Sequence, residues 1–164
     1  MSSEPSGSHG LPPGYQISTD PARLDLEVVH RYLGEESYWA RGISRDMIER
    51  MVSGSLCFGL YAPDGAQVGF ARAITDRATF AWLADVFVAT TEQGRGLGKA
   101  LIAEVVAHPD LRDIRRIMLV TRDAHGLYTQ FGFAPPARSD LLMERLDPAA
   151  RERLLAFPAV PVLP

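Results

Sequence analysis

The chain has 164 residues and a formal net charge of −3 at pH 7, with 46% hydrophobic and 23% charged residues. This length suits one domain with a substantial core, and the composition is typical of a globular protein rather than a disordered chain. The weak negative charge excludes the strongly basic surface on which nucleic-acid binding usually depends. No apolar run approaches the ~18 residues that span a bilayer. We therefore expect neither a nucleic acid nor a membrane as a partner.

The two ends of the chain differ from its centre in composition. Residues 1–14 are polar and rich in Ser, Gly and Pro, which predicts a disordered tail and not a secretion signal. Residues 147–164 are expected to form a C-terminal tail, so the domain itself spans 15–146. The single cysteine, Cys57, cannot form an internal disulfide, and we therefore expect a cytoplasmic protein.

The domain begins with a predicted strand and two predicted helices. Residues 15–19 alternate apolar and polar side chains, as a short strand does. Asp20, followed by a proline, is a typical helix N-cap and predicts a helix over about 22–33, ended by a glycine. Ser44 is the expected N-cap of a second short helix over 45–52.

The middle of the chain predicts an antiparallel meander of three strands. Residues 56–61 and 67–74 have strand character, and the turn between them, 63–66, has the Pro-Asp-Gly-Ala sequence of a hairpin. A second turn near 75–77 leads into a longer strand over 79–89.

The last third predicts two more helices and two more strands. Apolar residues over 97–105 predict a buried helix that ends before Pro109. Residues 114–121 and 141–145 are predicted strands, and Asp123 is the expected cap of a short helix between them. The resulting order, β-α-α-β-β-β-α-β-α-β, indicates an α/β (α+β) fold with one mixed, mostly antiparallel sheet flanked by helices.

A glycine-rich turn, Gln-Gly-Arg-Gly-Leu-Gly over 93–98, joins the third strand of the meander to the helix that follows. Such a turn directs several backbone N–H groups to one place beside a helix N-terminus, which favours a phosphate. The P-loop pattern fails, because Gln93 stands where a glycine is needed and Ala100 follows Lys99. The dinucleotide fingerprint fails because its third glycine position holds Lys99 or Leu101.

This turn, following Val88, resembles the acyl-CoA loop of the GNAT N-acetyltransferase superfamily, whose pattern is Gln or Arg, two residues, Gly, one residue, then Gly or Ala. One helix and one strand later, 128–133 (YTQFGF) resembles the Tyr-x-x-x-Gly-Phe motif of the same family. The two motifs stand in the family's order, and the resemblance covers roughly 15–145. Thr121 stands where the family often has Asn, and Asp123 is the nearest group that could do similar work.

The resemblance implies acetyl-CoA as a co-substrate. Backbone N–H groups over 94–99 would bind its pyrophosphate, Lys99 or Arg95 would add charge, and the backbone of two strand residues would pair with the pantetheine arm as an added strand does. The residues implied for acetyl-CoA binding are Phe87, Val88, Gln93, Gly94, Arg95, Gly96, Leu97, Gly98, Lys99 and Asp123.

Transfer of an acyl group from a thioester to an amine needs a base for the amine and an acid for the departing thiolate. Asp85 is the candidate base, because a carboxylate is costly in an otherwise apolar strand unless it is paired. An ion pair with Arg72 on the neighbouring strand would explain Asp85 equally well. Tyr128 is the acid that the resemblance implies, with a half-buried structural tyrosine as the alternative. No His, Asp and Glu residues have metal-ligand spacing, so we expect no metal.

The acceptor is less defined by the sequence. Tyr38 and Trp39 lie in the loop between the first two helices, where the family's acceptor site usually lies, although packing of the first helix would also explain them. We expect the primary amine of a small molecule, attacking directly in a ternary complex. A non-catalytic acyl-CoA-binding sensor and a protein N-terminal or lysine acetyltransferase are the alternatives. A homodimer, common in this family, would involve 141–143.

Overall fold

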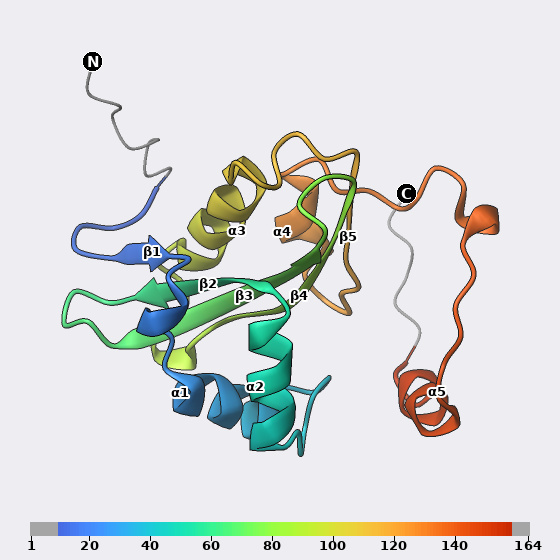
Figure 1. Ribbon diagram of the computed structural model, residues 1–164, viewed down its shortest axis with the longest axis horizontal. Helices are drawn as coiled ribbons and strands as arrows, with labels where there is room; N and C mark the ends of the chain where they lie inside the picture. The colour runs from blue at the N-terminus through green and yellow to red at the C-terminus, as the bar shows by residue number, and fades with distance from the viewer. Residues whose placement is uncertain (1–9, 159–164) are drawn as a thin grey trace. The chain divides into compact units, whose positions relative to one another are not determined.

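The computed structural model describes residues 10–158 and divides into two compact units, the first ending at Val120 and the second beginning at Thr121. Each unit is described by itself (Figure 1). The helices and strands of the first unit are β1 Gln16–Ser18, α1 Leu26–Arg31, α2 Arg45–Ser53, β2 Leu56–Tyr61, β3 Gln67–Thr75, β4 Phe80–Val88, α3 Leu97–Ala107 and β5 Arg116–Met118.

The first unit is built on one sheet with the strand order β1-β2-β3-β4-β5. Neighbouring strands are antiparallel except β4 and β5, which are parallel. The predicted three-stranded meander is thus confirmed as β2, β3 and β4. The predicted α/β class, with a mostly antiparallel sheet flanked by helices, is also confirmed.

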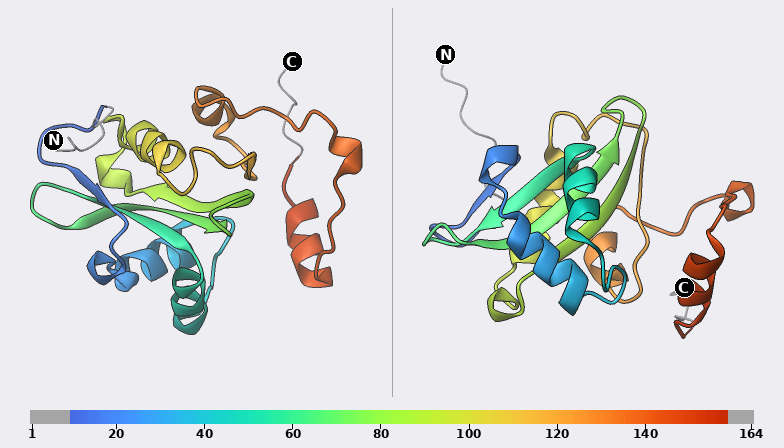
Figure 2. Two further views of the ribbon diagram at one scale, coloured as in Figure 1. Left: turned by 45° about the horizontal axis from the view of Figure 1, so that its top comes forward. Right: turned by 60° about the horizontal axis from the view of Figure 1, so that its bottom comes forward.

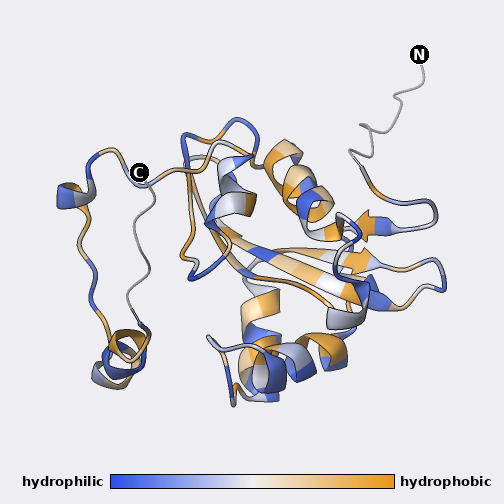
Figure 3. Cartoon of the chain, turned by 180° about the vertical axis from the view of Figure 1, so that it is seen from behind, coloured by the Kyte–Doolittle hydropathy of each residue, from blue (hydrophilic) through white to orange (hydrophobic). Residues whose placement is uncertain are grey.

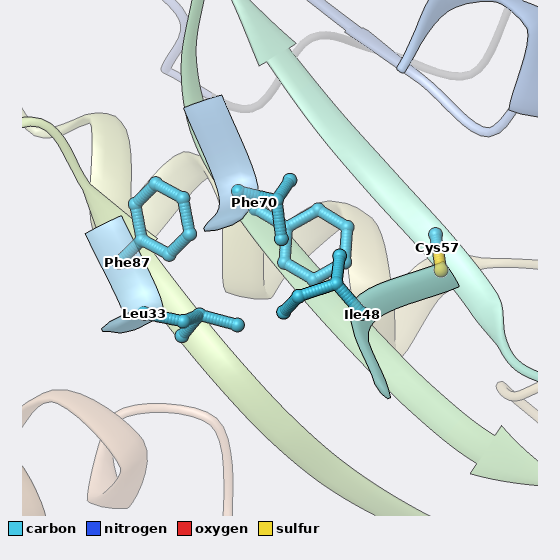
Figure 4. Packing of buried hydrophobic residues seen from close by; sticks show 6 residues of the cluster. Leu33, Ile48, Cys57, Phe70 and Phe87 are labelled. Atoms are coloured by element: carbon cyan, nitrogen blue, oxygen red, sulfur yellow. The ribbon is translucent and has the colours of Figure 1, made fainter. Parts of the chain in front are cut away.

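Helices cover both faces of this sheet. Helices α1 and α2 lie on one face and α3 on the other (Figures 1 and 2). The first face is closed by a cluster whose side chains are at most 6% exposed, and Figure 4 shows its packing. The strands and α3 are largely hydrophobic, whereas the turns are hydrophilic (Figure 3). The buried cluster consists of Val29, Leu33, Ile48, Cys57, Phe70 and Phe87.

The first predicted helix is wrong in its bounds. Asp20 does cap a turn, but only a 3₁₀ turn over Pro21–Arg23, after which the backbone is extended at Leu24. A second aspartate, Asp25, accepts hydrogen bonds from two backbone N–H groups and starts α1 at Leu26. The glycine at 34 does not end the helical segment, because a π-helical turn continues over Tyr32–Glu36.

Other bounds of the first unit follow the prediction more closely. The expected strand over 114–121 is shorter than predicted, because within the described residues only 116–118 of this segment, which form β5, pair with β4. Helix α2 begins as expected, because the Ser44 side chain accepts a hydrogen bond from the Met47 N–H. Helix α3 ends before Pro109, also as predicted.

The second unit contains α4, His125–Thr129, and α5, Pro148–Leu155, with a 3₁₀ turn over Ser139–Leu141 between them. The predicted strand over 141–145 is wrong: within the described part of this unit no strand is formed. A strand needs a neighbour for its backbone groups, and an alternating sequence does not supply one. Helix α5 lies where we expected only a tail, and Asp147 caps it with a proline at its first position. None of the described helices is long and apolar enough to cross a membrane.

Candidate functional site

Strand β4 carries an irregularity at Asp85. Its backbone has φ +54°, a left-handed conformation that non-glycine residues rarely adopt. The register with β3 shifts there, because Phe70 pairs with Phe87 whereas Arg72 pairs with Ala84. One extra residue in β4 therefore forms a bulge. Strain of this kind costs about 1–3 kcal/mol and is frequent at functional sites.

The Asp85 carboxylate accepts hydrogen bonds through both oxygens. Nε and Nη2 of Arg72 each lie 2.8 Å from Oδ2, and the side chains of the pair are only 12% and 8% exposed. The indole Nε1–H of Trp39 donates to Oδ1 at 3.0 Å. Arg72 is itself held by Ser55, whose Oγ accepts from Nη1 at 3.1 Å. The ion pair with Arg72 considered for Asp85 from the sequence is therefore present.

The loop after α1 brings Trp39 to the bulge. Trp39 is 42% exposed, and the Tyr38 ring packs edge to face against its ring at 4.9 Å between centroids. Ser37, which is buried, holds the start of this loop: its Oγ donates to the Leu33 carbonyl and accepts from the Ala40 N–H. Of the two aromatic residues expected at the acceptor site, Trp39 contacts Asp85 directly. Sequence reasoning missed Ser37, because its role depends on the π-helical turn before it.

Beyond the bulge, one edge of β4 is unpaired. The paired residues of β5 reach only as far as Trp82 on β4, so in the described residues no strand pairs with Leu83 to Val88 on that side. Phe87 and Val88, expected to contact the pantetheine arm, lie in this stretch. An unpaired strand edge presents backbone N–H and C=O groups that an extended ligand can use.

The glycine turn follows this edge and leads into α3. Gly94 and Gly96 have φ of +82° and +78°, and a Cβ added at either would meet no atom within 4 Å. The turn is thus open where side chains of other residues would stand. Gln93 fastens it to β4, because its Nε2 donates to the Val88 carbonyl at 3.2 Å.

The N-terminus of α3 is free to bind an anion. Gly96 is its N-cap, and within the described residues no side chain accepts from the N–H groups of the first turn, which also contains no acidic residue. These N–H groups, those of Leu97, Gly98 and Lys99, carry the positive end of the helix dipole. The Lys99 side chain is exposed in the same turn.

Arg95 is engaged by residues that sequence reasoning missed. Its guanidinium lies near Glu92, with 3.6 Å between Nε and Oε2, and near Tyr15, which precedes β1. Tyr15 is 77 residues from Glu92 in the sequence, so no local pattern could have revealed this contact. Across residues 10–158 no group of three or more His, Cys, Asp or Glu side chains is arranged to hold a metal ion.

In the second unit, the tyrosine motif forms the end of α4. The Tyr128 carbonyl accepts from the N–H groups of Phe131 and Phe133, and the chain turns at Gly132 with φ +83°. The Tyr128 and Phe133 rings pack edge to face at 5.7 Å. These contacts hold Tyr128, Phe131 and Phe133 together at the C-terminal end of α4.

The predicted cap of α4 is wrong. The N-cap is Ala124, with no side-chain hydrogen bond, and Asp123 instead forms an ion pair with Arg122 at 3.2 Å. Thr121 instead stabilises the turn before this helix, because its Oγ1 accepts a hydrogen bond from the Ala124 N–H at 3.0 Å. The residue at the family's asparagine position therefore shapes the turn before α4.

Comparison with known proteins identifies the relatives of this chain. The model of the Acetyltransferase (GNAT) family matches residues 25–133. A protein of Gibberella zeae with a provisional acetyltransferase name is 31% identical over 133 aligned residues, which cover 70% of this chain and 75% of that protein. A solved structure of a GNAT-family protein from Xanthomonas campestris, also provisionally named an acetyltransferase, is 49% identical with a TM-score of 0.80, covering 83% of this chain and 95% of that chain.

A more distant structure is similar in fold alone. Glucosamine-6-phosphate N-acetyltransferase from Arabidopsis thaliana is 12% identical with a TM-score of 0.58, covering 80% of this chain and 97% of that chain. Together, the family match and the two nearer relatives confirm the resemblance found in the sequence. They show that the protein is an acyltransferase enzyme, and that the chain belongs to the GNAT family of acetyltransferases.

Proposed function

We propose that this protein is an acetyl-CoA-dependent N-acetyltransferase that acts on the primary amine of a small molecule. The observation that carries the proposal is the open glycine turn before α3. Two left-handed glycines, Gly94 and Gly96, leave space where a Cβ would stand, and the helix behind them begins without a side-chain cap. Oxygen atoms of a pyrophosphate are suitable acceptors for these N–H groups.

The residues around the turn fit the rest of acetyl-CoA. Lys99 and Arg95 offer positive charge to its phosphates, and the unpaired edge at Phe87 and Val88 offers backbone groups to the amide-containing pantetheine arm. The thioester at the end of that arm would supply the acetyl group. No metal is needed for this transfer, since an amine attacks a thioester carbonyl directly.

Asp85 is proposed as the base for the acceptor. A free aliphatic ammonium, with a pKa near ~10.4, is about 99.9% protonated at pH 7, so the site must remove a proton or select the neutral amine. Two N–H groups of Arg72 donate to Oδ2 of Asp85, whereas within the described part of the chain Oδ1 accepts only from the indole N–H of Trp39. Oδ1 is therefore the oxygen that can receive the amine's N–H, with Trp39 and Tyr38 beside it. Tyr128 is proposed to protonate the departing thiolate.

The first test is calorimetric titration of the purified protein with acetyl-CoA. We expect micromolar binding that Gly96→Asp abolishes, because its carboxylate would stand where the pyrophosphate is expected. Tyr128→Phe should keep the binding, since the phenol is assigned to the chemical step. The absence of binding by the unmodified protein would overturn the proposal.

The second test identifies the acceptor. Release of free CoA thiol is followed with a panel of small primary amines and, in parallel, with peptides that carry a free N-terminus or a lysine. Turnover of a small amine supports the proposal, and Tyr128→Phe should then turn over that amine more slowly. Turnover of peptides alone would favour a protein acetyltransferase, and acetyl-CoA binding without turnover of any acceptor would favour a sensor.

A further inference from the structure

A contact that no family motif predicts joins the segment before β1 to the glycine turn. The Tyr15 hydroxyl donates a hydrogen bond to Oε2 of Glu92 at 2.5 Å. Glu92 ends a 3₁₀ turn over Thr90–Glu92, immediately before the glycine turn, and its side chain is only 19% exposed. Two residues that are 77 positions apart in the sequence therefore meet at one carboxylate.

Arg95 competes for the same carboxylate oxygen. It stands between Gly94 and Gly96, its Nε lies 3.6 Å from Oε2 of Glu92, and its Nη1 donates to the Tyr15 oxygen at 3.4 Å. A separation of 3.6 Å is an ion pair without a normal hydrogen bond, whereas 2.5 Å is a short hydrogen bond. The phenol therefore holds the oxygen, and the Arg95 side chain remains 55% exposed.

The phenol is also in the protonation state that this contact requires. The hydrogen bond to Glu92 raises the pKa of Tyr15 above its ordinary value, followed by a smaller contribution from desolvation. The hydroxyl therefore keeps its proton at neutral pH and remains a donor. It neutralises none of the carboxylate's charge, but it occupies one lone pair of Oε2, the oxygen that lies nearest to the Arg95 guanidinium.

The electrostatic consequence concerns the phosphate ligand. A carboxylate beside the turn repels phosphate, and an arginine bound closely to that carboxylate offers less net charge to the ligand. Tyr15 reduces this loss of charge, since its hydrogen bond to Oε2 of Glu92 competes with a closer contact between Glu92 and Arg95. Glu92 produces the first effect whether Tyr15 is present or not.

We propose that Tyr15 is a positioning residue for the acyl-donor site, which occupies Glu92 and so keeps the Arg95 guanidinium available to the phosphates of an acyl-CoA. This inference rests on the proposed function. It makes the segment before β1 part of the donor site, although this segment is distant from the glycine turn in the sequence. It also assigns Glu92 and Tyr15 opposite effects on affinity.

The test is calorimetric titration of coenzyme A into four proteins at about 50 mM and about 300 mM NaCl: the unmodified chain, Tyr15→Phe, Glu92→Gln and the double variant. At the lower salt concentration we expect Tyr15→Phe to bind roughly threefold to tenfold more weakly and Glu92→Gln roughly twofold to fivefold more tightly, with both differences smaller at the higher salt concentration. The double variant should bind like Glu92→Gln, because Tyr15 acts only through Glu92.

Tyr61→Phe is the matched control. The Tyr61 hydroxyl is buried and has no hydrogen-bond partner among the residues that the structure describes, so its removal should leave CoA affinity unchanged. In a turnover assay Tyr15→Phe should raise KM for acetyl-CoA and leave kcat unchanged, which a general loss of structure would not do.

Each result bears on one hypothesis. The positioning role is overturned if Tyr15→Phe binds coenzyme A as tightly as the unmodified chain does. It is also overturned if Tyr15→Phe weakens binding by the same factor in the unmodified chain and in Glu92→Gln. Weaker binding by Glu92→Gln overturns it as well. Failure of the unmodified chain to bind coenzyme A overturns the proposed function itself.

Discussion

Arg72 binds Asp85 through a single carboxylate oxygen, with Nε and Nη2 both 2.8 Å from Oδ2. Among residues 10–158, the other oxygen, Oδ1, accepts a hydrogen bond only from the indole N–H of the exposed Trp39. The carboxylate is thus held at Oδ2 by the arginine and at Oδ1 by the indole, and its side chain is 8% exposed. This arrangement pairs a charge that would be costly to bury alone, and the proposed role of Asp85 as a base depends on Oδ1.

Asp85→Asn should reduce kcat/KM for the acceptor amine by about 10²–10⁴-fold, because the amide cannot accept the amine's proton. It should also destabilise the fold, by up to about 3 kcal/mol, since Arg72 loses its charged partner. Steady-state kinetics and urea unfolding measure the two effects. Arg72→Gln is the matched control: it breaks the same pair, so it should cost similar stability and much less activity. Equal activity losses in the two variants would assign Asp85 a structural role alone.

Gly96→Ala should weaken acetyl-CoA binding and also lower stability by about 1 kcal/mol, because alanine is strained at positive φ. Gly65→Ala is the control. Gly65 lies in the turn between β2 and β3, has φ +87° and, like Gly96, has open space at the Cβ position. It should show the same stability loss with unchanged affinity. Calorimetry and urea unfolding of both variants test this, and equal affinity losses would place the effect in the scaffold.

Ile48→Ala should lower the free energy of unfolding by about 2–5 kcal/mol, because it opens a cavity in the cluster between α2 and the sheet. Ile48 is 0% exposed, whereas its neighbour Met47 on the same helix is 44% exposed. Met47→Ala should therefore change stability by no more than about 0.5 kcal/mol. Urea unfolding measures both. A loss of similar size in Met47→Ala would contradict the assignment of the buried face of α2.

Asp76 should stabilise the turn between β3 and β4 in a pH-dependent way. Its carboxylate accepts hydrogen bonds from the Thr79 hydroxyl and from three backbone N–H groups, and these hold the pKa of Asp76 well below its ordinary value. Since the folded pKa is the lower one, the stabilisation is fully present above the unfolded value of about 3.9 and is lost as pH falls below it. Asp76→Ala should thus lose stability at pH 7, and the difference from the unmodified chain should shrink in acid. A difference independent of pH would contradict this account.

Cys57 should react slowly with thiol reagents while the protein is folded. Burial raises the pKa of its thiol from 9.0 to about 11, Arg72 lowers it to a smaller extent, and the reactive species is the thiolate. At pH 8 the folded protein should therefore react about 100-fold more slowly than the unfolded chain in urea. Absorbance of the released chromophore of a disulfide reagent follows both reactions. Fast reaction without denaturant would show that the cluster around Cys57 is open to the reagent.

The elements whose signals are local were predicted well. The hairpin of β2 and β3, the serine cap of α2 and the proline that ends α3 each depend on residues that are close together in the sequence. The helix over 22–33 was predicted to begin too early, because Asp20 and Asp25 are both competent caps and the sequence does not rank them. The strand over 141–145 was wrong, since a strand exists only where another strand receives its hydrogen bonds.

Some residues of the candidate site were likewise predicted from local patterns, whereas contacts between distant segments were not. Gly94 and Gly96 were found because a glycine-rich turn between a strand and a helix is visible in the sequence, and the pairing of Arg72 with Asp85 was considered because β3 and β4 are consecutive strands. Two other contacts of the site were not foreseen. Trp39 reaches Asp85 across 46 residues, and Tyr15 reaches Glu92 across 77.

The sequence by itself thus determined the sheet of meander strands, the glycine turn and the family, because these depend on short patterns of residue type and on their order. Only the tertiary structure decided which oxygen of Asp85 each of its partners contacts and which residues surround Arg95. Those contacts join segments whose separation along the chain is bridged by the packing of helices on the sheet. Their geometry follows from distances between side chains, which no local pattern encodes.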